Sequence, residues 1–206
     1  MPVHDPLTFL LAAAAAVAFL VTVACLAILH RLPTGLHPVR DAVSLYGVTP
    51  QAAWYRRQVV AAGIGALLLA FALARTDAGR PLPLALLAVY GLGRIAIAWF
   101  PTDAGGAPLT STGRRHALLA AAAFLAIGLA APPLGRAIAD QPASGVLGEI
   151  LPGLGLAVGA TVLATLAAGS LARSGMRVFG AVERLFYASS LAFLLATASW
   201  VLQLAR

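Results

Sequence analysis

The sequence contains no lysine and has few charged residues of any kind. Only 10% of its 206 residues are charged, whereas a soluble globular domain usually has about 25%. Hydrophobic residues make up 61% of the chain, and the mean hydropathy is +0.91. This composition excludes an ordinary soluble domain and indicates an integral membrane protein.

Cysteine is almost absent as well. The single Cys25 lies within the first apolar stretch, which excludes a disulfide framework and a cysteine-based metal motif. The first residues also lack the basic region of a signal peptide, and the apolar run that follows is too long for one. We therefore expect this run to be a permanent first helix.

The formal net charge of +7 comes from 14 arginines against seven acidic residues. A basic balance can indicate nucleic-acid binding. In this chain, however, the arginines lie at the ends of apolar segments, where they meet lipid phosphates and set the orientation of the protein. We therefore expect membrane lipids as partners and no nucleic acid.

Six apolar segments approach the length of about 20 residues that spanning the hydrocarbon core requires. The fold class that we predict is therefore all-α: a polytopic six-transmembrane-helix bundle, with residues 1–206 as a single integral membrane domain. In the fifth segment, Gly155 and Gly159 have the spacing that lets helix backbones approach closely, which we expect to serve packing inside the bundle. The expected helices are 7–30, 57–75, 83–100, 116–134, 150–171 and 184–204.

Six spans place both termini on one side of the membrane, and the loops alternate between the two sides. Cytoplasmic loops carry an excess of positive charge. We therefore expect a multi-pass protein of the cell membrane with its odd-numbered loops in the cytoplasm and both termini outside. The odd-numbered loops carry nine arginines (Arg31, Arg40, Arg56, Arg57, Arg114, Arg115, Arg173, Arg177 and Arg184), and the terminal side carries four (Arg75, Arg80, Arg136 and Arg206).

The first loop carries polar residues at helical spacing. His37, Asp41 and Ser44 fall at positions i, i+4 and i+7, so they share one face if residues 38–46 form a helix. Gly47 suits the C-terminal cap of such a helix. The alternative is an amphipathic half-helix that lies on the membrane surface, with His37 at its polar edge.

The third loop combines turn residues with a histidine. Asp103 followed by Ala-Gly-Gly is typical of a turn, and Ser111 or Thr112 suits the N-cap of the next helix. His116 lies in the first turn of that helix, where the helix dipole disfavours a charged imidazolium. A neutral imidazole can accept a proton or bind a metal. Since a turn and a cap do not need a histidine, His116 is the more informative residue.

Arg94 is the only arginine deep within an apolar segment. It lies about eleven residues from one end of segment 83–100 and about six from the other, which predicts a position near the bilayer midplane. A charge at that depth costs roughly 2.5–3.5 kcal/mol, so we expect Arg94 to face the interior of the bundle. Tyr90, one turn earlier, is the expected neighbour.

The odd-numbered loops together place most of the chemistry-bearing residues at one membrane surface. We expect Asp103 and His116 to be joined by a hydrogen bond and to lie close to the first loop around Asp41 and Ser44, forming one site. The candidate catalytic residues, if the protein is an enzyme, are His37, Asp41, Ser44, Asp103 and His116. The candidate ligand-binding residues are Arg40, Tyr46, Arg94, Thr110, Arg114, Arg115, Glu183 and Arg184.

These motifs resemble those of a known family. In them the chain is similar, over nearly its whole length, to the domain of unknown function 998 family, which consists of six-helix membrane proteins of bacteria and archaea. The resemblance implies a six-helix fold, brings no established activity and gives no role to Arg94. The residues that carry it are Pro38-Val-Arg-Asp41-Ala-Val-Ser44-Leu-Tyr46-Gly47, Phe100-Pro-Thr-Asp103, Thr110, Gly113, His116, Gly180-Ala-Val-Glu183-Arg184 and Trp200.

Several functions remain open on these residues. The first is a polar surface pocket for a lipid head group or another small anionic ligand, which arginines would bind through charge-assisted bonds. The second is a metal-dependent hydrolase that acts on a lipid, for which the sequence offers ligand types but no compact motif. The third is a haem protein, with His30 or His37 opposite His116, and the fourth is a structural or assembly protein without catalysis. The residues would be Arg40, Arg114, Arg115 and Arg184 for the anion, and His37, Asp41, Asp103 and His116 for the metal.

Overall fold

The structure is a computed structural model that describes residues 5–171 and 178–206. Every regular element in these two ranges is a helix, as the all-α prediction requires. The elements are α1 (Pro6–Arg31), the short 3-10 helix η1 (Val43–Val48), α2 (Ala52–Leu73), α3 (Pro81–Ile97), α4 (Ser111–Ala139), α5 (Gly145–Leu171) and α6 (Phe179–Leu204).

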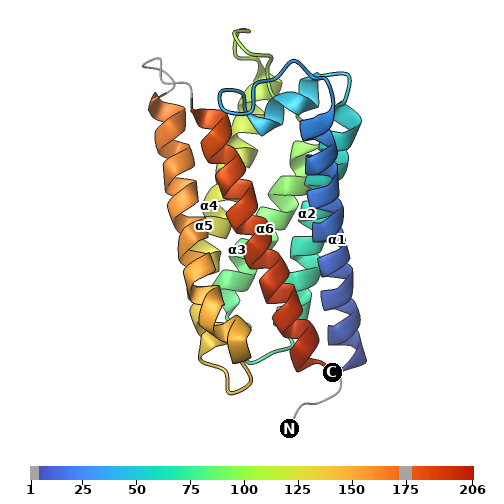
Figure 1. Ribbon diagram of the computed structural model, residues 1–206, viewed down its shortest axis with the longest axis vertical. Helices are drawn as coiled ribbons and strands as arrows, with labels where there is room; N and C mark the ends of the chain where they lie inside the picture. Colours follow the sequence, from blue (N-terminus) through green and yellow to red (C-terminus); the bar gives the residue numbers. More distant parts are fainter. Residues whose placement is uncertain (1–4, 172–177) are drawn as a thin grey trace.

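The α-helices form one up-and-down bundle (Figure 1). Each helix packs beside the next along the chain, and α1 also packs against α6. The connections 32–51 and 98–110 lie at one end of the bundle, which we call the loop end. The start of α1 and the end of α6 lie at the opposite end, which we call the terminal end. The first and third loops therefore share one end, as the alternation of apolar segments predicts.

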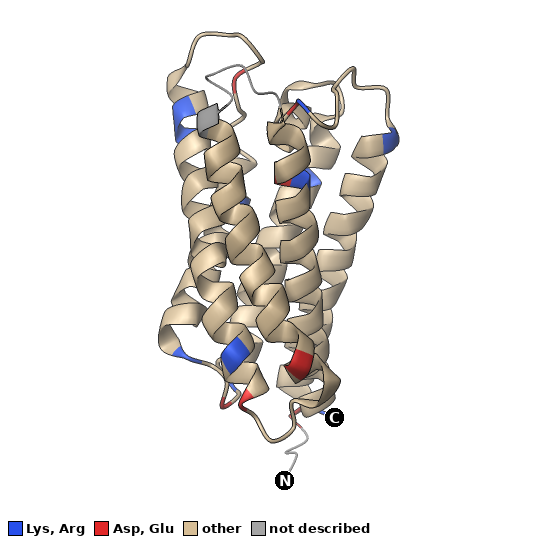
Figure 2. Cartoon of the chain, turned by 60° about the vertical axis from the view of Figure 1, so that its left-hand side comes forward, with Lys and Arg blue, Asp and Glu red and all other residues tan. Residues whose placement is uncertain are grey.

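The surface of the bundle is suited to lipid. Five helices (α1, α2, α4, α5 and α6) are long and apolar enough to cross a membrane, and α3 is a shorter apolar helix of 17 residues. Large apolar side chains such as Leu10, Phe71, Leu129 and Leu163 are exposed on the outside. Charged residues lie mainly toward the two ends of the bundle (Figure 2). These features indicate a multi-pass membrane protein.

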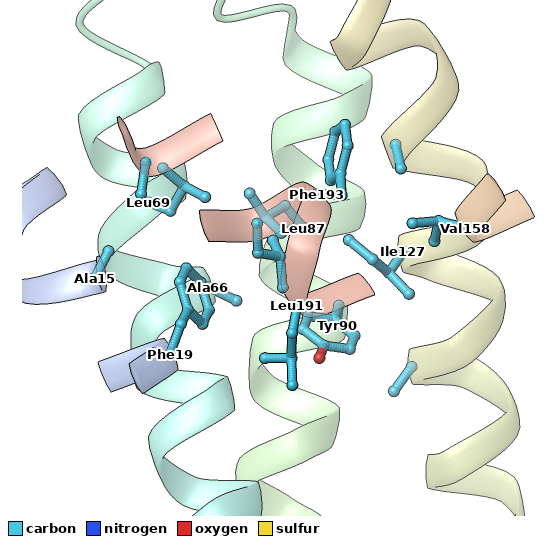
Figure 3. Close-up of a cluster of buried hydrophobic side chains, with 14 of the residues drawn as sticks. Ala15, Phe19, Ala66, Leu69, Leu87, Tyr90, Ile127, Val158, Leu191 and Phe193 are labelled. Atoms are coloured by element: carbon cyan, nitrogen blue, oxygen red, sulfur yellow. The ribbon is translucent and has the colours of Figure 1, made fainter. Parts of the chain in front are cut away.

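The interior is filled by a continuous cluster of apolar side chains (Figure 3). In a membrane, close packing of this kind holds helices together, because lipid tails are as apolar as the side chains themselves. Every α-helix contributes at least one fully buried residue to the cluster. Examples in chain order are Phe19, Leu69, Leu87, Ile127, Val158 and Phe193.

Some helices begin before the apolar segments that predict them. α2 begins at Ala52 and not at 57, and α4 begins at Ser111 and not at 116. Hydropathy marks the part of a helix that suits hydrocarbon, whereas the helix itself begins where a cap satisfies its first amide groups. The N-cap of α4 is Thr110, whose hydroxyl accepts the Gly113 N–H at 3.0 Å, so the predicted caps Ser111 and Thr112 are wrong.

Glycines bring α4 and α5 into direct contact in the half of the bundle near the terminal end. A Cβ atom on Gly155 would lie 2.5 Å from the carbonyl oxygen of Ala131, closer than real Cβ atoms come. On α4, a Cβ on Gly135 would lie 2.6 Å from the carbonyl oxygen of Leu151. Gly155 therefore serves packing inside the bundle, as its spacing with Gly159 predicts.

The first loop does not contain the predicted helix over residues 38–46. Its first part is a turn in which the carboxylate of Asp41 accepts the His37 N–H at 2.6 Å, and the backbone at Ala42 is extended. The regular part is η1, which packs against α2 and α6 and buries Tyr46. The prediction is wrong because the side chain of Asp41 satisfies a nearby amide and so competes with helix formation.

Arg184 holds this loop against the bundle. Its Nη1 donates to the carbonyl oxygens of Pro38 at 2.7 Å and Asp41 at 2.9 Å, and its Nε donates to Nε2 of His30 at 2.7 Å. The loop lies directly on α6 at Gly180, where a Cβ atom would collide with the carbonyl oxygen of Asp41. One guanidinium thus ties the first loop to both α1 and α6.

The contact between α4 and α5 can be tested with one methyl group. Gly155→Ala should lower the free energy of unfolding. Overpacking costs about 1–3 kcal/mol, which outweighs the ~1 kcal/mol by which a helix prefers alanine to glycine. Gly153→Ala is the matched control, since nothing lies within 4 Å of a Cβ there. Thermal unfolding in a nonionic detergent measures both variants, and equal midpoints would contradict the contact.

The role of Arg184 can be tested by hydrogen exchange. Arg184→Ala should speed amide exchange across residues 37–46 by tenfold or more, because a hydrogen bond from a charged group contributes about 1.5–3 kcal/mol. Arg40→Ala is the control, since Arg40 is exposed in the same loop. Mass spectrometry of exchanged peptides reports the rates. Similar exchange in both variants would show that the loop is held by other contacts.

Candidate functional site

A cavity of about 520 Å³ lies at the loop end of the bundle. The first loop contributes Ala42 and Ser44 to its lining, and the walls come from every α-helix except α1. Its α4 side is mainly apolar. The polar lining residues are Ser44, Tyr55, Arg94, Thr102, His116, Thr165, Glu183 and Tyr187. Four of the predicted site residues, Ser44, Arg94, His116 and Glu183, therefore lie around one space.

Arg94 belongs to the last turn of α3, because α3 ends at Ile97. The predicted segment 83–100 extends three residues beyond the end of α3, so Arg94 lies closer to the end of its helix than the sequence predicts. The side chain of Arg94 is 1% exposed, so it does face the interior. A cation in the last turn of a helix is favoured by the helix dipole, which explains part of its stability there.

The guanidinium of Arg94 joins three helices. Its Nη1 donates to the hydroxyl of Tyr187 on α6 at 2.9 Å, and its Nη2 donates to Oε1 of Gln58 on α2 at 3.0 Å. These partners are not Tyr90, the neighbour that the sequence predicts. The Nε of Arg94 is buried and has no hydrogen-bond partner among the described residues. One donor of this cation is therefore available to a further group.

Among the described residues, no carboxylate forms an ion pair with Arg94, although Glu183 lines the same cavity. The only ion pair within residues 5–171 and 178–206 joins Arg75 to Asp5 at the terminal end, with 2.8 Å between Nη2 and Oδ2. A buried charge without an ion partner is costly in a medium of low dielectric constant. The hydrogen-bond partners of Arg94 among the described residues, Tyr187 and Gln58, are both uncharged side chains.

Glu183 carries the opposing charge in the cavity. Its side chain is buried, and its Oε2 accepts the Val43 N–H at 2.6 Å. Because Val43 is the first residue of η1, this bond fixes the start of η1 against α6. The carboxyl group thus has a structural partner in the first loop and is not held by Arg94.

His116 presents one ring nitrogen to the cavity. Its Nδ1 lies 2.7 Å from the carbonyl oxygen of Phe100. Since a carbonyl can only accept, Nδ1 carries the hydrogen, and Nε2 is the unprotonated nitrogen of the neutral ring. No described residue donates to Nε2 through a hydrogen bond. His116 can therefore accept a proton from a ligand or, once protonated, donate to an anion.

The two aspartates expected at the site instead close turns. Both carboxylate oxygens of Asp103 bond to Thr110, one to its amide at 2.9 Å and one to its hydroxyl at 2.6 Å. The hydrogen bond from the Thr110 side chain is the main reason that the pKa of Asp103 is lowered. The described residues form no hydrogen bond between Asp103 and His116. Asp41 is used by His37 in the same way, and neither aspartate lines the cavity.

The remaining predicted residues lie outside the cavity. His37, Arg40, Arg114 and Arg115 are exposed at the loop end, and Arg115 lies over the ring of Phe100. Arg184 is engaged by the first loop, and Tyr46 is buried beneath it with its hydroxyl 3.4 Å from Nη2 of Arg184. Thr110 caps α4. Of the arginines predicted to bind an anion or another ligand, Arg94 is therefore the one that lines the cavity.

The geometry gives little support to a metal or haem centre. The part of the chain that the structure describes holds no group of three or more His, Cys, Asp or Glu side chains placed to bind a metal ion. Both ring nitrogens of His30 are already hydrogen-bonded, Nδ1 to the Leu26 carbonyl at 2.6 Å and Nε2 to Arg184. His37 is exposed in the turn at the start of the first loop, whereas a haem ligand opposite His116 would have to lie inside the bundle.

The structure adds residues that the sequence analysis missed. Gln58 and Tyr187 lie in predicted apolar segments, where a polar side chain needs a partner, and Tyr55 lies two residues before one of these segments. That mismatch between residue and segment is the signal that could have found them. It could not have shown that Gln58 and Tyr187 bond to Arg94, because their helices meet only in the folded bundle.

The comparisons with known proteins give a family but no activity. No curated protein and no solved structure matches the chain. The family described as "Protein of unknown function (DUF998)" matches residues 13–200. This range includes α2, α3, α4 and α5 in full and most of α1 and α6, so the match covers both the bundle and the cavity. The chain therefore belongs to the DUF998 family.

Proposed function

We propose that this protein is a six-span membrane protein that binds the anionic group of a lipid head group or another small anionic ligand in the cavity at its loop end. The observation that carries the proposal is Arg94, a buried cation that lines the cavity and forms no ion pair with a carboxylate of the described residues. Its Nε lacks a partner, and His116 stands in the same lining. An anion against Arg94 would supply the missing charge and accept the unused donor.

Other functions have weaker support. A metal-dependent hydrolase needs a set of ligands that the described residues do not bring together. A purely structural role accounts for the bonds of Arg94 to Tyr187 and Gln58 but gives no use to its Nε or to the cavity beside it. The anion-binding function accounts for both.

We propose α3 as the sixth span. Its 17 residues give a length of about 26 Å at 1.5 Å per residue, within the range of about 17–25 residues that spans use. It lies in the bundle between α2 and α4, which are both long enough to cross a membrane. Because α3 lies beside these two helices, we expect it to cross the same hydrophobic layer.

We further propose that the loop end faces the cytoplasm of a cell-membrane protein and that both termini are outside. The support is the excess of nine arginines over four in the loops at that end. Two of the nine, Arg173 and Arg177, lie outside the described residues. The other seven still outnumber the four at the terminal end.

Anion binding can be tested through thermal stability. We expect inorganic phosphate or palmitoyl lysophosphatidic acid to stabilise the purified protein in nonionic detergent, by about 2.7 kcal/mol at a hundred times the Kd. Arg94→Gln should abolish this effect, Arg94→Lys should keep part of it, and Glu183→Gln should bind at least as well as the native protein because it removes the opposing charge. Thermal melting curves measure each variant.

Arg114→Gln is the matched control for Arg94, because Arg114 is an exposed arginine at the same end of the bundle. It should respond to the anions as the native protein does. Stabilisation that survives in Arg94→Gln, or that is lost equally in Arg114→Gln, would overturn the cavity as the site. The absence of stabilisation by both probes would overturn the proposed function.

The topology can be tested by labelling single cysteines in a Cys25→Ala background. Ala107 lies exposed between α3 and α4, and Ala143 lies exposed between α4 and α5. A membrane-impermeant maleimide should label Ala143→Cys in intact cells and label Ala107→Cys only after lysis. The reverse pattern would invert the orientation, and labelling of both in intact cells would contradict a span by α4.

A further inference from the structure

We propose that the occupant of the cavity is a membrane lipid with an anionic head group, which enters sideways from the bilayer between α4 and α5. This inference rests on the proposed function and names the source of the anion. Its head group would lie against Arg94 and His116, and its acyl chain would leave the bundle along the apolar wall formed by α4 and α5.

The α4 side of the cavity is built from small residues near the outer surface. Ala117, Ala120 and Ala121 all line the cavity; Ala117 is exposed and the other two are half-buried. Opposite them, α5 contributes Thr165, Leu166 and Gly169 to the lining, and Gly169 is half-buried. Residues that line a cavity and are also accessible from outside mark an opening, and alanine and glycine leave room for a chain to pass. The described helices therefore leave a lateral path between α4 and α5.

This path is confined to the half of the bundle near the loop end. Toward the terminal end, Gly155 and Gly135 bring the backbones of α5 and α4 into direct contact, with no room for a Cβ atom. Gly155 lies about three helical turns from Thr165, and Gly135 lies about four turns from Ala121. The same pair of helices is thus closed at one end and lines a cavity at the other.

Entry from the aqueous side is restricted by the first loop. Ala42 and Ser44 of this loop belong to the cavity lining, and the loop is tied down by Arg184 and by the bond between Val43 and Glu183. A free anion that enters beside the first loop would have to pass this fastened segment. A lipid already lies beside the exposed apolar surfaces of α4 and α5, and only its head group needs to move inward.

The chemistry of the walls matches one amphiphilic molecule. Arg94 and His116 provide a cation and a ring nitrogen on the inner side, whereas Phe124 and Phe179 provide aromatic surface. The volume of about 520 Å³ is within the range of about 300–1,000 Å³ typical of small-molecule sites. Arg94 on one side and apolar surface on the other suit an anionic head group with a chain, while the carboxyl group of Glu183 in the same lining is bonded to the Val43 N–H.

Native mass spectrometry of the full-length protein in nonionic detergent tests this inference. The probes are palmitoyl lysophosphatidic acid, palmitoyl lysophosphatidylcholine and glycerol 3-phosphate, which separate the anionic head from the chain. We expect one equivalent of lysophosphatidic acid, with at least tenfold weaker binding of the other two. Gly169→Leu should weaken lysophosphatidic acid binding by tenfold or more, because it adds a side chain to the cavity lining beside Phe179.

Two pairs of variants distinguish blocking of the lateral path from a general loss of folding. Gly169→Leu should still fold, since a Cβ there meets only the ring of Phe179 at an ordinary 3.4 Å, and Gly153→Leu on the same helix is its control. Ala117→Trp blocks the path from α4, and Leu118→Trp is its control, because Leu118 is 66% exposed and does not line the cavity. Both controls should bind as the native protein does.

The outcomes distinguish the two proposals. Tight glycerol 3-phosphate binding that depends on Arg94 would overturn the lipid inference and keep the anion site. Equal lysophosphatidic acid binding by a blocking variant and its control would overturn lateral entry. Binding of lysophosphatidylcholine as tight as that of lysophosphatidic acid would overturn the anionic head group. If no probe binds to the native protein, both proposals fail.

Discussion

The buried guanidinium of Arg94 is the constraint on which the loop end of this bundle depends. A charge in a medium of low dielectric constant must find donors and acceptors inside the protein. Arg94 takes them from Tyr187 on α6 and Gln58 on α2, so one side chain of α3 sets the spacing of three helices. Because α3 ends at Ile97, one turn beyond Arg94, the cavity lies directly at the end of this short helix.

The polar residues at the loop end form two groups. One group shapes the loops, and the other lines the cavity. Arg184 and Asp41 shape the first loop, and Asp103 and Thr110 shape the connection into α4. Their side chains form hydrogen bonds to backbone groups or to each other. Several of these residues belong to the motifs that resemble the family, so a motif residue can be needed for folding without touching a ligand. The polar residues that line the cavity, such as Arg94 and His116, lie further inside the bundle.

Lipid and packing explain the rest of the arrangement. The outside of the helices remains apolar, because in a bilayer such surfaces need no cover. Association then rests on how closely the helices fit, and glycines supply the fit between α4 and α5 at Gly135 and Gly155. Where alanines and Gly169 line the cavity instead, the same two helices leave space. Small residues therefore allow direct helix contact near the terminal end, and they line the cavity near the loop end.

The sequence by itself determined the all-α class, the alternation of apolar segments and the burial of Arg94, because hydropathy and the cost of a charge in an apolar segment are local properties. It also indicated the loop end as the location of His116 and Glu183. It could not determine that the first loop forms η1 and not a helix over 38–46, since a side-chain bond of Asp41 decides this. The sequence also could not show that Arg94 bonds to Tyr187 instead of Tyr90. These partners lie on helices far apart in the chain, so only the tertiary structure decided which polar groups meet, and where a cavity remains between them.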